Sequence, residues 1–244
     1  MDADLDRLRR AWGLLGEDDP LWAILSQPDK RGGGWHPEEF FASGESEIAG
    51  LDAWCALLGF PTQRRRALDF GCGVGRLSRA LATRYTEVIG VDISASMIAH
   101  ARRLNEGIGH LRFVENARHD LAFVESASVD FVYSMITLQH MPAPLQRAYI
   151  AEFLRVLAAG GLAVFQVAVA HTRDLRGWTH RLIPNRMLNP LRRRRYRSRA
   201  AFEMYVLPEA DVQAVVAAAG KRVVHVEELD VAGAGFRGRR FYVV

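Results

Sequence analysis

The sequence has few cysteines and no long apolar run. Its two cysteines, Cys55 and Cys72, cannot form the disulfide framework of a small secreted domain, and their spacing matches no zinc-binding motif. No apolar stretch approaches the ~20 residues that span a bilayer, and the first residues lack the pattern of a signal peptide. These absences argue against a disulfide-stabilised or membrane-spanning protein, so we expect a cytoplasmic one.

Lysine is also scarce, and acidic residues are missing from one stretch. Lys30 and Lys221 are the only lysines, so arginine supplies almost all of the positive charge. Between Asp174 and Glu203 the chain has nine arginines and no acid. The formal net charge of +4 therefore divides into one strongly basic segment and a mildly acidic remainder.

The length of 244 residues fits one large domain that buries a sizeable core. Apolar residues make up 49% of the chain and charged residues 25%, as in ordinary soluble proteins. We expect an N-terminal helical lid, a core, a basic cap segment and a C-terminal part that completes the core. The predicted boundaries are 1–60, 61–170, 171–206 and 207–244.

Residues 1–60 are predicted to form several short helices, because apolar residues recur there at helical spacing. Pro37, followed by two glutamates, is typical of the first turn of a helix. A separate helix is predicted from Glu47 to Leu58, ended by Gly59 and Pro61.

From Arg66 onward, strand patterns alternate with helix patterns, which indicates a doubly wound, mostly parallel α/β sheet. Ser94 is a candidate cap for the second helix, and Gly160-Gly161 is expected to end the third. The predicted strands are 66–70, 87–91, 111–115, 129–134 and 162–169. The predicted helices are 75–84, 95–105 and 143–158.

After the cap segment the pattern predicts a helix at 209–219 and strands at 221–229 and 239–244. The two strands are joined by a short loop without a helix, so they must pair antiparallel. Ligands of such a sheet bind at the carboxyl ends of its parallel strands, near the switch point beside the first strand.

A glycine-rich turn lies at that switch point. Ala67 to Leu81 runs from an apolar strand through Gly71-x-Gly73-x-Gly75 into a helix, which favours a ligand close to the backbone. The spacing differs from the G-x-G-x-x-G of dinucleotide enzymes. Asp92 ends the second strand and is placed to bind the diol of a ribose. These residues predict a site for an adenosine cofactor.

The stretches D-F-G-C-G-V-G-R and G-V-D-I-S resemble the class I S-adenosylmethionine-dependent methyltransferases, in particular their small-molecule branch, over about residues 66–169. This resemblance implies a Rossmann-like, seven-stranded sheet with an antiparallel last strand. It also implies S-adenosyl-L-methionine as methyl donor and S-adenosyl-L-homocysteine as product. The histidines form no recognisable metal motif, so no metal is expected.

The resemblance implies roles for particular residues. Asp92 would accept hydrogen bonds from the ribose, while Asn116, or alternatively the backbone at Ala117, would meet the adenine edge. The alternative role of Asp69 is to stabilise the turn, and the alternative role of Met97 is that of a core side chain. The positions implied to line the cofactor are Asp69, Gly71, Cys72, Gly73, Gly75, Asp92, Ile93, Met97 and Met135.

His140 is the first candidate for a catalytic base, because an imidazole titrates near neutral pH. It lies in Leu-Gln-His-Met-Pro after the fourth strand, where the related enzymes face the methyl group. Gln139 would orient the substrate. His36 and His171 are weaker candidates for the base. For each of the three histidines, the alternative is a structural or solvated side chain without a catalytic role.

Other residues are candidates for binding the methyl acceptor. Trp35 is expected in the lid, and Arg181 and Tyr205 lie in the cap segment. The arginine-rich stretch 178–199 is open to four interpretations: recognition of an anionic substrate, contact with an anionic membrane, contact with nucleic acid, or a solvated cap. Its place between the fifth strand and the last helix favours a substrate cap.

The sequence therefore predicts a methyltransferase that acts on a small molecule, at an oxygen of a natural product, sugar, carboxylic acid or lipid precursor. N- or C-methylation and a peptide or nucleic-acid substrate remain alternatives. Thr137-Leu-Gln-His occupies the place of the N-P-P-Y motif of base methylation, which argues against nucleic acid. Two further alternatives are an oxidoreductase and a non-catalytic cofactor-binding or membrane-associated module.

Overall fold

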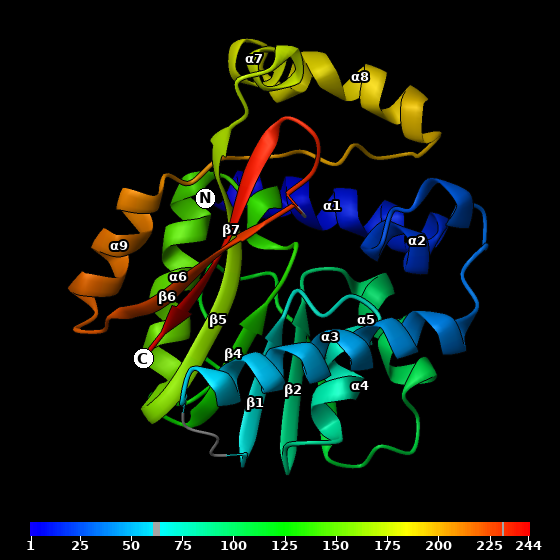
Figure 1. Ribbon diagram of the computed structural model, residues 1–244. Coiled ribbons are helices and arrows are strands. Elements are labelled where there is room, and N and C mark those ends of the chain that lie inside the picture. Colours follow the sequence, from blue (N-terminus) through cyan, green and yellow to red (C-terminus); the bar gives the residue numbers. More distant parts are fainter. Residues whose placement is uncertain (61–63, 231) are drawn as a thin grey trace.

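The computed structural model describes residues 1–60, 64–230 and 232–244. Its centre is a seven-stranded sheet with the order β3-β2-β1-β4-β5-β7-β6, in which β7 pairs antiparallel with β5 and β6 (Figure 1). This confirms the predicted fold class. The strands are β1 (Arg66–Phe70), β2 (Glu87–Asp92), β3 (Leu111–Glu115), β4 (Val129–Ser134), β5 (Leu157–His171), β6 (Val223–Leu229) and β7 (Phe236–Val243).

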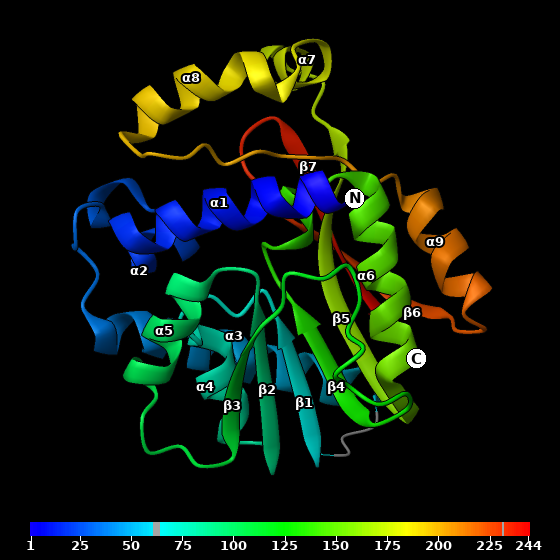
Figure 2. The same ribbon diagram turned by 180° about the vertical axis from the view of Figure 1, so that it is seen from behind.

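Helices cover both faces of the sheet. α3 and α4 lie on one face, and α6 and α9 lie on the other (Figures 1 and 2). The α-helices are α1 (Asp2–Asp18), α2 (Pro20–Ile24), α3 (Pro37–Leu57), α4 (Arg76–Ala82), α5 (Ala95–Leu104), α6 (Ala143–Val156), α7 (Leu175–Leu182), α8 (Asn185–Tyr196) and α9 (Glu209–Ala218), with short 3-10 turns at Pro28–Lys30 and Leu138–His140.

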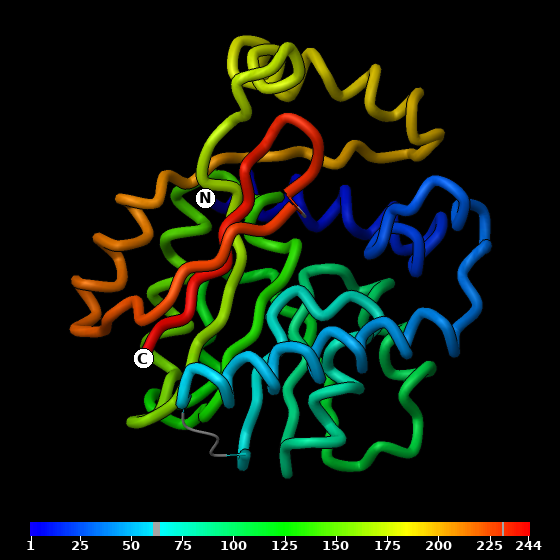
Figure 3. Tube along the Cα trace, viewed as in Figure 1, coloured from blue at the N-terminus to red at the C-terminus, as the bar shows by residue number. Residues whose placement is uncertain are grey.

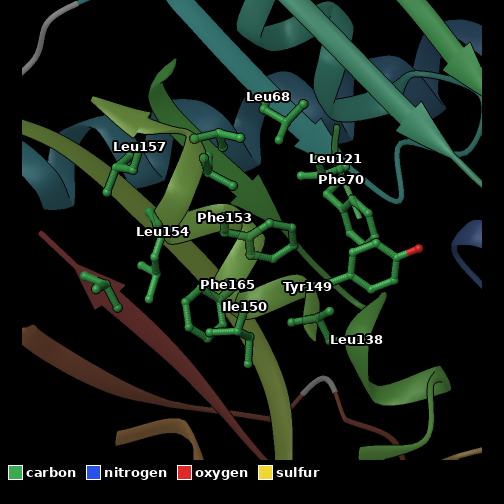
Figure 4. Close-up of a cluster of buried hydrophobic side chains, with 14 of the residues drawn as sticks. Leu68, Phe70, Leu121, Leu138, Tyr149, Ile150, Phe153, Leu154, Leu157 and Phe165 are labelled. Atoms are coloured by element: carbon green, nitrogen blue, oxygen red, sulfur yellow. The ribbon is translucent and has the colours of Figure 1, made fainter. Parts of the chain in front are cut away.

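The alternation of side chains along β1 explains the two cores. Ala67 faces the cluster shared with α3 and α4, whereas Leu68 and Phe70 face the cluster shared with α6. In the second cluster Phe70 packs on Tyr149 and Phe153, with ring centroids 4.4 and 5.0 Å apart (Figure 4). Both faces of β1 are therefore buried, as expected for a parallel strand inside a sheet.

Several predicted boundaries are wrong. α3 is one helix of 21 residues, not two, because Gly44 is buried inside it against Arg76, where a Cβ would lie 2.4 Å from a backbone oxygen. The predicted stop at Gly59 lies just beyond its end, and Pro61 lies outside the described residues. A glycine inside a helical pattern can thus serve close packing and need not end the helix.

The boundary between α6 and β5 also differs from the prediction. α6 ends at Val156, and β5 begins at Leu157, which pairs with Val129. Pairing with β4 then shifts and resumes at Leu162, with Gly160 at φ 74° in between. Gly160-Gly161 therefore lies in an irregular stretch of the strand and does not end the helix. At the other edge β7 begins at Phe236, three residues before the predicted start.

The cap segment is helical, which the sequence did not predict. The side chain of Asp174 caps α7 by accepting a hydrogen bond from the N–H of Gly177, at 2.8 Å. α8 continues through Pro190 on the surface, where water can satisfy the carbonyl group that proline leaves free. The tube in Figure 3 shows both helices standing above α1 and the β6–β7 loop. In the described ranges, no helix is long and apolar enough to cross a membrane.

Ser94 caps α5 as predicted, since its Oγ accepts a hydrogen bond from the N–H of Met97 at 3.2 Å. Ser94→Ala is expected to lower the free energy of unfolding by about 1 kcal/mol, measured by urea denaturation. Ser46→Ala is the matched control, because Ser46 lies exposed inside α3, where alanine is the better helix former. An equal loss in both variants would contradict the capping role.

Candidate active site

A cavity of about 780 Å³ lies above the carboxyl ends of β1, β2 and β4. Its floor is formed by Gly71, Cys72 and Gly73 of the glycine loop (residues 71–75), together with residues at the ends of β2 and β4. α1 and α2 form one wall, and the cap segment and the β6–β7 loop close the opposite end. The cavity thus joins the predicted cofactor position to the cap segment in one space.

The glycine loop is held tightly beneath the cavity. The N–H groups of Gly71 and Cys72 donate to the carbonyl of Val91, at 2.7 and 3.0 Å. Gly71 and Gly73 have φ angles of 78° and 53°, which favour glycine. A Cβ on Gly71 would lie 2.1 Å from Thr137, and one on Gly73 would lie 2.4 Å from Ile24. The glycines therefore allow a tight backbone turn at the cavity floor.

Asp92 braces this loop and also lines the cavity. One carboxylate oxygen accepts the N–H of Gly73 and the other accepts the N–H of Ser94, each at 2.9 Å. Burial raises the pKa of Asp92, while these backbone donors act in the opposite direction. A carboxylate has about four acceptor positions, so two remain for a ligand. Ile93 and Met97 add apolar surface beside it.

Two residues expected to line the cofactor lie elsewhere. Asp69 is buried beneath the loop, where it accepts a hydrogen bond from the hydroxyl of Ser78 at 2.6 Å, and burial raises its pKa to about 7. Gly75 begins α4 against Phe113. Neither lines the cavity, so Asp69 fits the alternative role of stabilising the turn. Cys72 does line the cavity, and burial raises the pKa of its thiol.

The stretch after β3 places only one of its two candidates on the cavity. Asn116 is buried and lines it, whereas Ala117 is exposed. The amide of Asn116 already donates to the carbonyl of Asp120 at 2.8 Å and accepts the N–H of Arg118 at 3.2 Å. Its amide oxygen retains one lone pair for a ligand.

The end of β4 brings Met135, Gln139 and His140 to the cavity. The amide oxygen of Gln139 accepts a hydrogen bond from the buried Gln166 at 2.8 Å, so its side chain is fixed. Gln166 also accepts the N–H of Ile136, at 3.1 Å. Ile136 has a φ of 54°, which is costly for a β-branched residue. No sequence pattern indicates this strained turn, which aims the following residues into the cavity.

His140 is buried in an aromatic surrounding. Its Nδ1 lies 2.8 Å from the carbonyl oxygen of Glu203 and must therefore carry the proton of the neutral ring. Trp12 packs edge-on at 5.2 Å between ring centroids. Burial lowers the pKa of His140 to about 4, and the charge of Arg192 acts in the same direction. The ring is therefore neutral near pH 7, with Nε2 able to accept a proton.

The other candidates for base and substrate contact lie outside the cavity lining. His36 is exposed at the start of α3, and His171 packs on Phe236. Trp35 is buried in the lid, where its indole donates to the carbonyl of Leu25. Because α1 and α2 lie between this part of the chain and the cap segment, Trp12 and not Trp35 reaches the cavity (Figure 1).

The arginines that the cap segment contributes to the cavity do not include Arg181, the one predicted to bind the substrate. Arg176, Arg192 and Arg195 line the cavity, whereas Arg181 lies over the exposed ring of Trp178. Within the described residues, no carboxylate forms an ion pair with these three lining arginines. Burial lowers the pKa of Arg192, whose guanidinium contacts Asn185 at 2.6 Å.

Tyr205, also expected to bind substrate, lies beside the cavity and does not line it. Its hydroxyl donates to the carboxylate of Glu203 at 2.6 Å, and its N–H donates to the carbonyl of Gln139 at 2.8 Å. It therefore positions the stretch that holds His140. Aromatic residues that the sequence did not single out complete the wall: Trp12, Tyr196 and Phe202.

The sheet order, the antiparallel β7, and the glycine loop with Asp92 define the fold of class I methyltransferases. Residues 67–161 match the family described as "Methyltransferase domain". Residues 67–161 therefore form a methyltransferase domain, and the fold around it is that of the class I S-adenosylmethionine-dependent methyltransferases.

Curated relatives agree with this assignment. The ubiquinone biosynthesis O-methyltransferase of Paracidovorax citrulli is 33% identical over 107 residues, which cover 43% of this chain and 44% of the relative. The trans-aconitate 2-methyltransferase of Deinococcus radiodurans is 31% identical over 153 residues, which cover 61% of this chain and 54% of the relative. These matches span about half the length of the relatives or less.

A solved structure resembles the chain along nearly its whole length. Magnesium protoporphyrin IX methyltransferase from Synechocystis PCC 6803, with bound SAH, has a TM-score of 0.62 and 21% identity, and the match covers 97% of each chain. At this identity the likeness shows a shared fold.

Proposed function

We propose that the protein transfers a methyl group from S-adenosyl-L-methionine to an oxygen of a small-molecule acceptor. The observation that carries this proposal is a single cavity with the glycine loop and Asp92 at one end and a neutral, buried histidine above them. The family assignment supports the methyl donor. Three relatives named above also bear the names of small-molecule methyltransferases.

The residues present fit this cofactor. Asp92 offers two acceptor positions for a ribose diol, and Ile93 and Met97 offer an apolar surface for a flat ring. Arg76 also lines the cavity, and its Nε is buried without a hydrogen-bond partner in the described part of the chain. A ligand carboxylate, such as that of a methionine tail, would satisfy this donor. Sequence reasoning had not assigned a role to Arg76.

When bound, the cofactor supplies an electrophilic methyl group on a sulfonium. The chain's own task is then to align the acceptor and to remove its proton. Nε2 of His140 accepts the proton from an acceptor hydroxyl, while Nδ1 stays bound to the carbonyl of Glu203. Gln139, fixed by Gln166, supplies a hydrogen bond that orients the acceptor. The surrounding apolar and aromatic side chains exclude water.

The cap end of the cavity favours an acceptor that is both anionic and partly apolar. Arg176, Arg192 and Arg195 present guanidinium groups, which bind carboxylate or phosphate. Trp12 and Phe202 provide rings for an apolar body between these arginines and His140.

Calorimetric titration with S-adenosylhomocysteine tests the cofactor. We expect one saturable site per chain and a rise in melting temperature with ligand concentration. NAD is the control, because the loop lacks the dinucleotide spacing. A folded sample that gives neither heat nor stabilisation with S-adenosylhomocysteine would refute the proposal.

Turnover separates an enzyme from a module that only binds the cofactor. Labelled S-adenosylmethionine would be incubated with phenols, sugars, carboxylic acids and lipid precursors. Label in an extracted product supports the proposal, and the site of methylation then shows whether the acceptor atom is oxygen. Binding of S-adenosylhomocysteine without a labelled product from any acceptor class would favour the binding module.

A further inference from the structure

The cap segment turns large apolar side chains outward. On α7, Leu175 is 82% exposed, Trp178 51% and Leu182 70%; on α8, Met187 is 66% and Leu191 65% exposed. Ile183 lies between the cap helices. The remaining large exposed apolar residues of the described chain lie elsewhere, two of them together at the end of α3: Met1, Trp54, Leu57 and Phe123. Large apolar side chains exposed together on neighbouring helices mark an interaction site.

On α7, helical spacing separates this surface from the cavity, whereas Leu191 on α8 is exposed and also borders the cavity. Leu175, Trp178 and Leu182 recur at i, i+3 and i+7 and share one face of α7. Arg176 and Thr179, on another face of the same helix, line the cavity. The side of α7 that faces the cavity is therefore polar and cationic, whereas its outer side is apolar. Folding of the chain alone does not account for these outward side chains.

Positive charge flanks the apolar surface. Arg181, Arg186, Arg193 and Arg194 are exposed on the same two helices, and no acidic residue occurs from 175 to 202. Arg199 differs, because it pairs with Glu17 and Asp18 on α1 and so ties the end of the cap segment to the lid. Of the arginines on the cap helices, none forms an ion pair with a described carboxylate.

We infer that the outer face of α7 and α8 docks on an anionic lipid bilayer. Helices that lie in a membrane interface combine leucine and tryptophan on one side with arginine beside them. Trp178 is suited to the headgroup level. Arginines next to an anionic surface add electrostatic attraction. The apolar residues would enter the acyl boundary, and the flanking guanidinium groups would meet lipid phosphates.

Other occupants fit this surface less well. A second copy of the same face would bring two sets of arginines together without acids to offset their repulsion. Nucleic acid would meet the charge but leave the aliphatic side chains of Leu175, Leu182 and Met187 unburied, with Trp178 as the single ring for stacking. A lipid surface satisfies both features.

Cosedimentation with vesicles tests the inference on the full chain. We expect binding to phosphatidylcholine vesicles that contain phosphatidylglycerol, and much weaker binding to phosphatidylcholine alone. High salt should weaken the binding only in part, because the apolar contacts are not screened. Equal binding to both vesicle types would overturn the anionic choice. Binding to duplex DNA or RNA without binding to vesicles would overturn the inference as a whole.

Two sets of variants locate the surface. Leu175→Gln, Trp178→Gln and Leu182→Gln together should weaken vesicle binding at least about tenfold, whereas Leu57→Gln, at a residue 74% exposed on α3, should not. Arg186→Gln with Arg194→Gln should weaken it about 25-fold, at about fivefold per charge.

The matched charge control is Arg112→Gln with Arg118→Gln, which removes the same charge from exposed positions outside the cap segment. Equal losses in the cap pair and the control pair would show a non-specific charge effect and overturn the docking surface. S-adenosylhomocysteine titration of each variant checks that it folds, and it reports on the proposed function separately from lipid binding.

Trp178 itself provides a spectroscopic test. Brominated acyl chains quench a tryptophan that enters the bilayer, so vesicles of such lipids should lower the fluorescence of the protein. Trp178→Phe should abolish this quenching, whereas Trp54→Phe, at an exposed tryptophan on α3, should retain it. Quenching that survives in Trp178→Phe would place another part of the protein in the membrane.

Discussion

Asp92→Ala is expected to bind S-adenosylhomocysteine at least about 100-fold more weakly than the unchanged protein. The carboxylate of Asp92 offers two acceptor positions to the cavity, and each hydrogen bond to a charged group contributes about 1.5–3 kcal/mol. The same oxygens hold the N–H groups of Gly73 and Ser94. Loss of these two hydrogen bonds also loosens the glycine loop. Calorimetry should therefore show weaker binding both because the ligand loses acceptors and because the loop is less ordered.

The control for this variant is Asp69→Asn. Asp69 lies beneath the same loop and outside the cavity, and its raised pKa of about 7 means that an amide resembles its protonated form. We expect it to retain cofactor affinity. If Asp69→Asn loses binding and Asp92→Ala keeps it, then the assignment of the two acids in this structure is wrong.

Affinity should also depend on pH through Asp92. Burial raises the pKa of its carboxyl above the ordinary value, so protonation begins at a higher pH than for an exposed aspartate. A protonated carboxyl loses acceptor capacity, and binding should therefore weaken as the pH falls. Asp92→Ala should remove this part of the pH dependence.

His140→Ala is expected to lower kcat by about 10²–10⁴-fold for a hydroxyl acceptor found in the panel, because general-base catalysis contributes that much. His36→Ala is the matched control, since His36 is exposed and outside the cavity, and it should keep full turnover. Full turnover by His140→Ala would contradict the base assignment. A carboxylate acceptor, which needs no base, would give that result.

The pH profile provides a second readout for His140. Its pKa of about 4 predicts that turnover stays high well below pH 6.5 and falls only near pH 4. The unfolded chain protonates this histidine at its ordinary value of about 6.5. Between these two values the unfolded state binds the additional proton, so His140 lowers stability as the pH falls across that window. His140→Ala should flatten the stability curve there.

The core of the fold was predictable because its signals are local. The strands β1 to β4 lie at or within one residue of their predicted positions, since each has a local strand pattern and helix patterns separate β1 from β2 and β2 from β3. Gly71, Gly73 and Asp92 lie on the cavity as predicted. The ends of two neighbouring strands and a tight turn bring them together, independently of how the rest of the chain folds. Their role in cofactor binding remains the prediction that the titrations test.

The cap segment was not predictable in the same way. Pro184 and Pro190 break the helical sequence pattern, yet Pro184 directly precedes α8 and Pro190 lies inside it. When the helices are not predicted, the face on which each side chain lies cannot be assigned. That face decides that Arg192 lines the cavity while Arg181 does not. Trp12 could not be singled out either, because only the position of α1 over the sheet brings its ring to His140.

α8 presents one side to the cavity and another to the surface for which we propose lipid. A helix that belongs to two contacts cannot change its position in one without changing the other. If the acceptor stabilises one position of α8, its binding energy and that of the membrane are thermodynamically coupled, and the coupling acts equally in both directions. Vesicles would then shift the affinity for the acceptor by the same factor by which the acceptor shifts the affinity for vesicles.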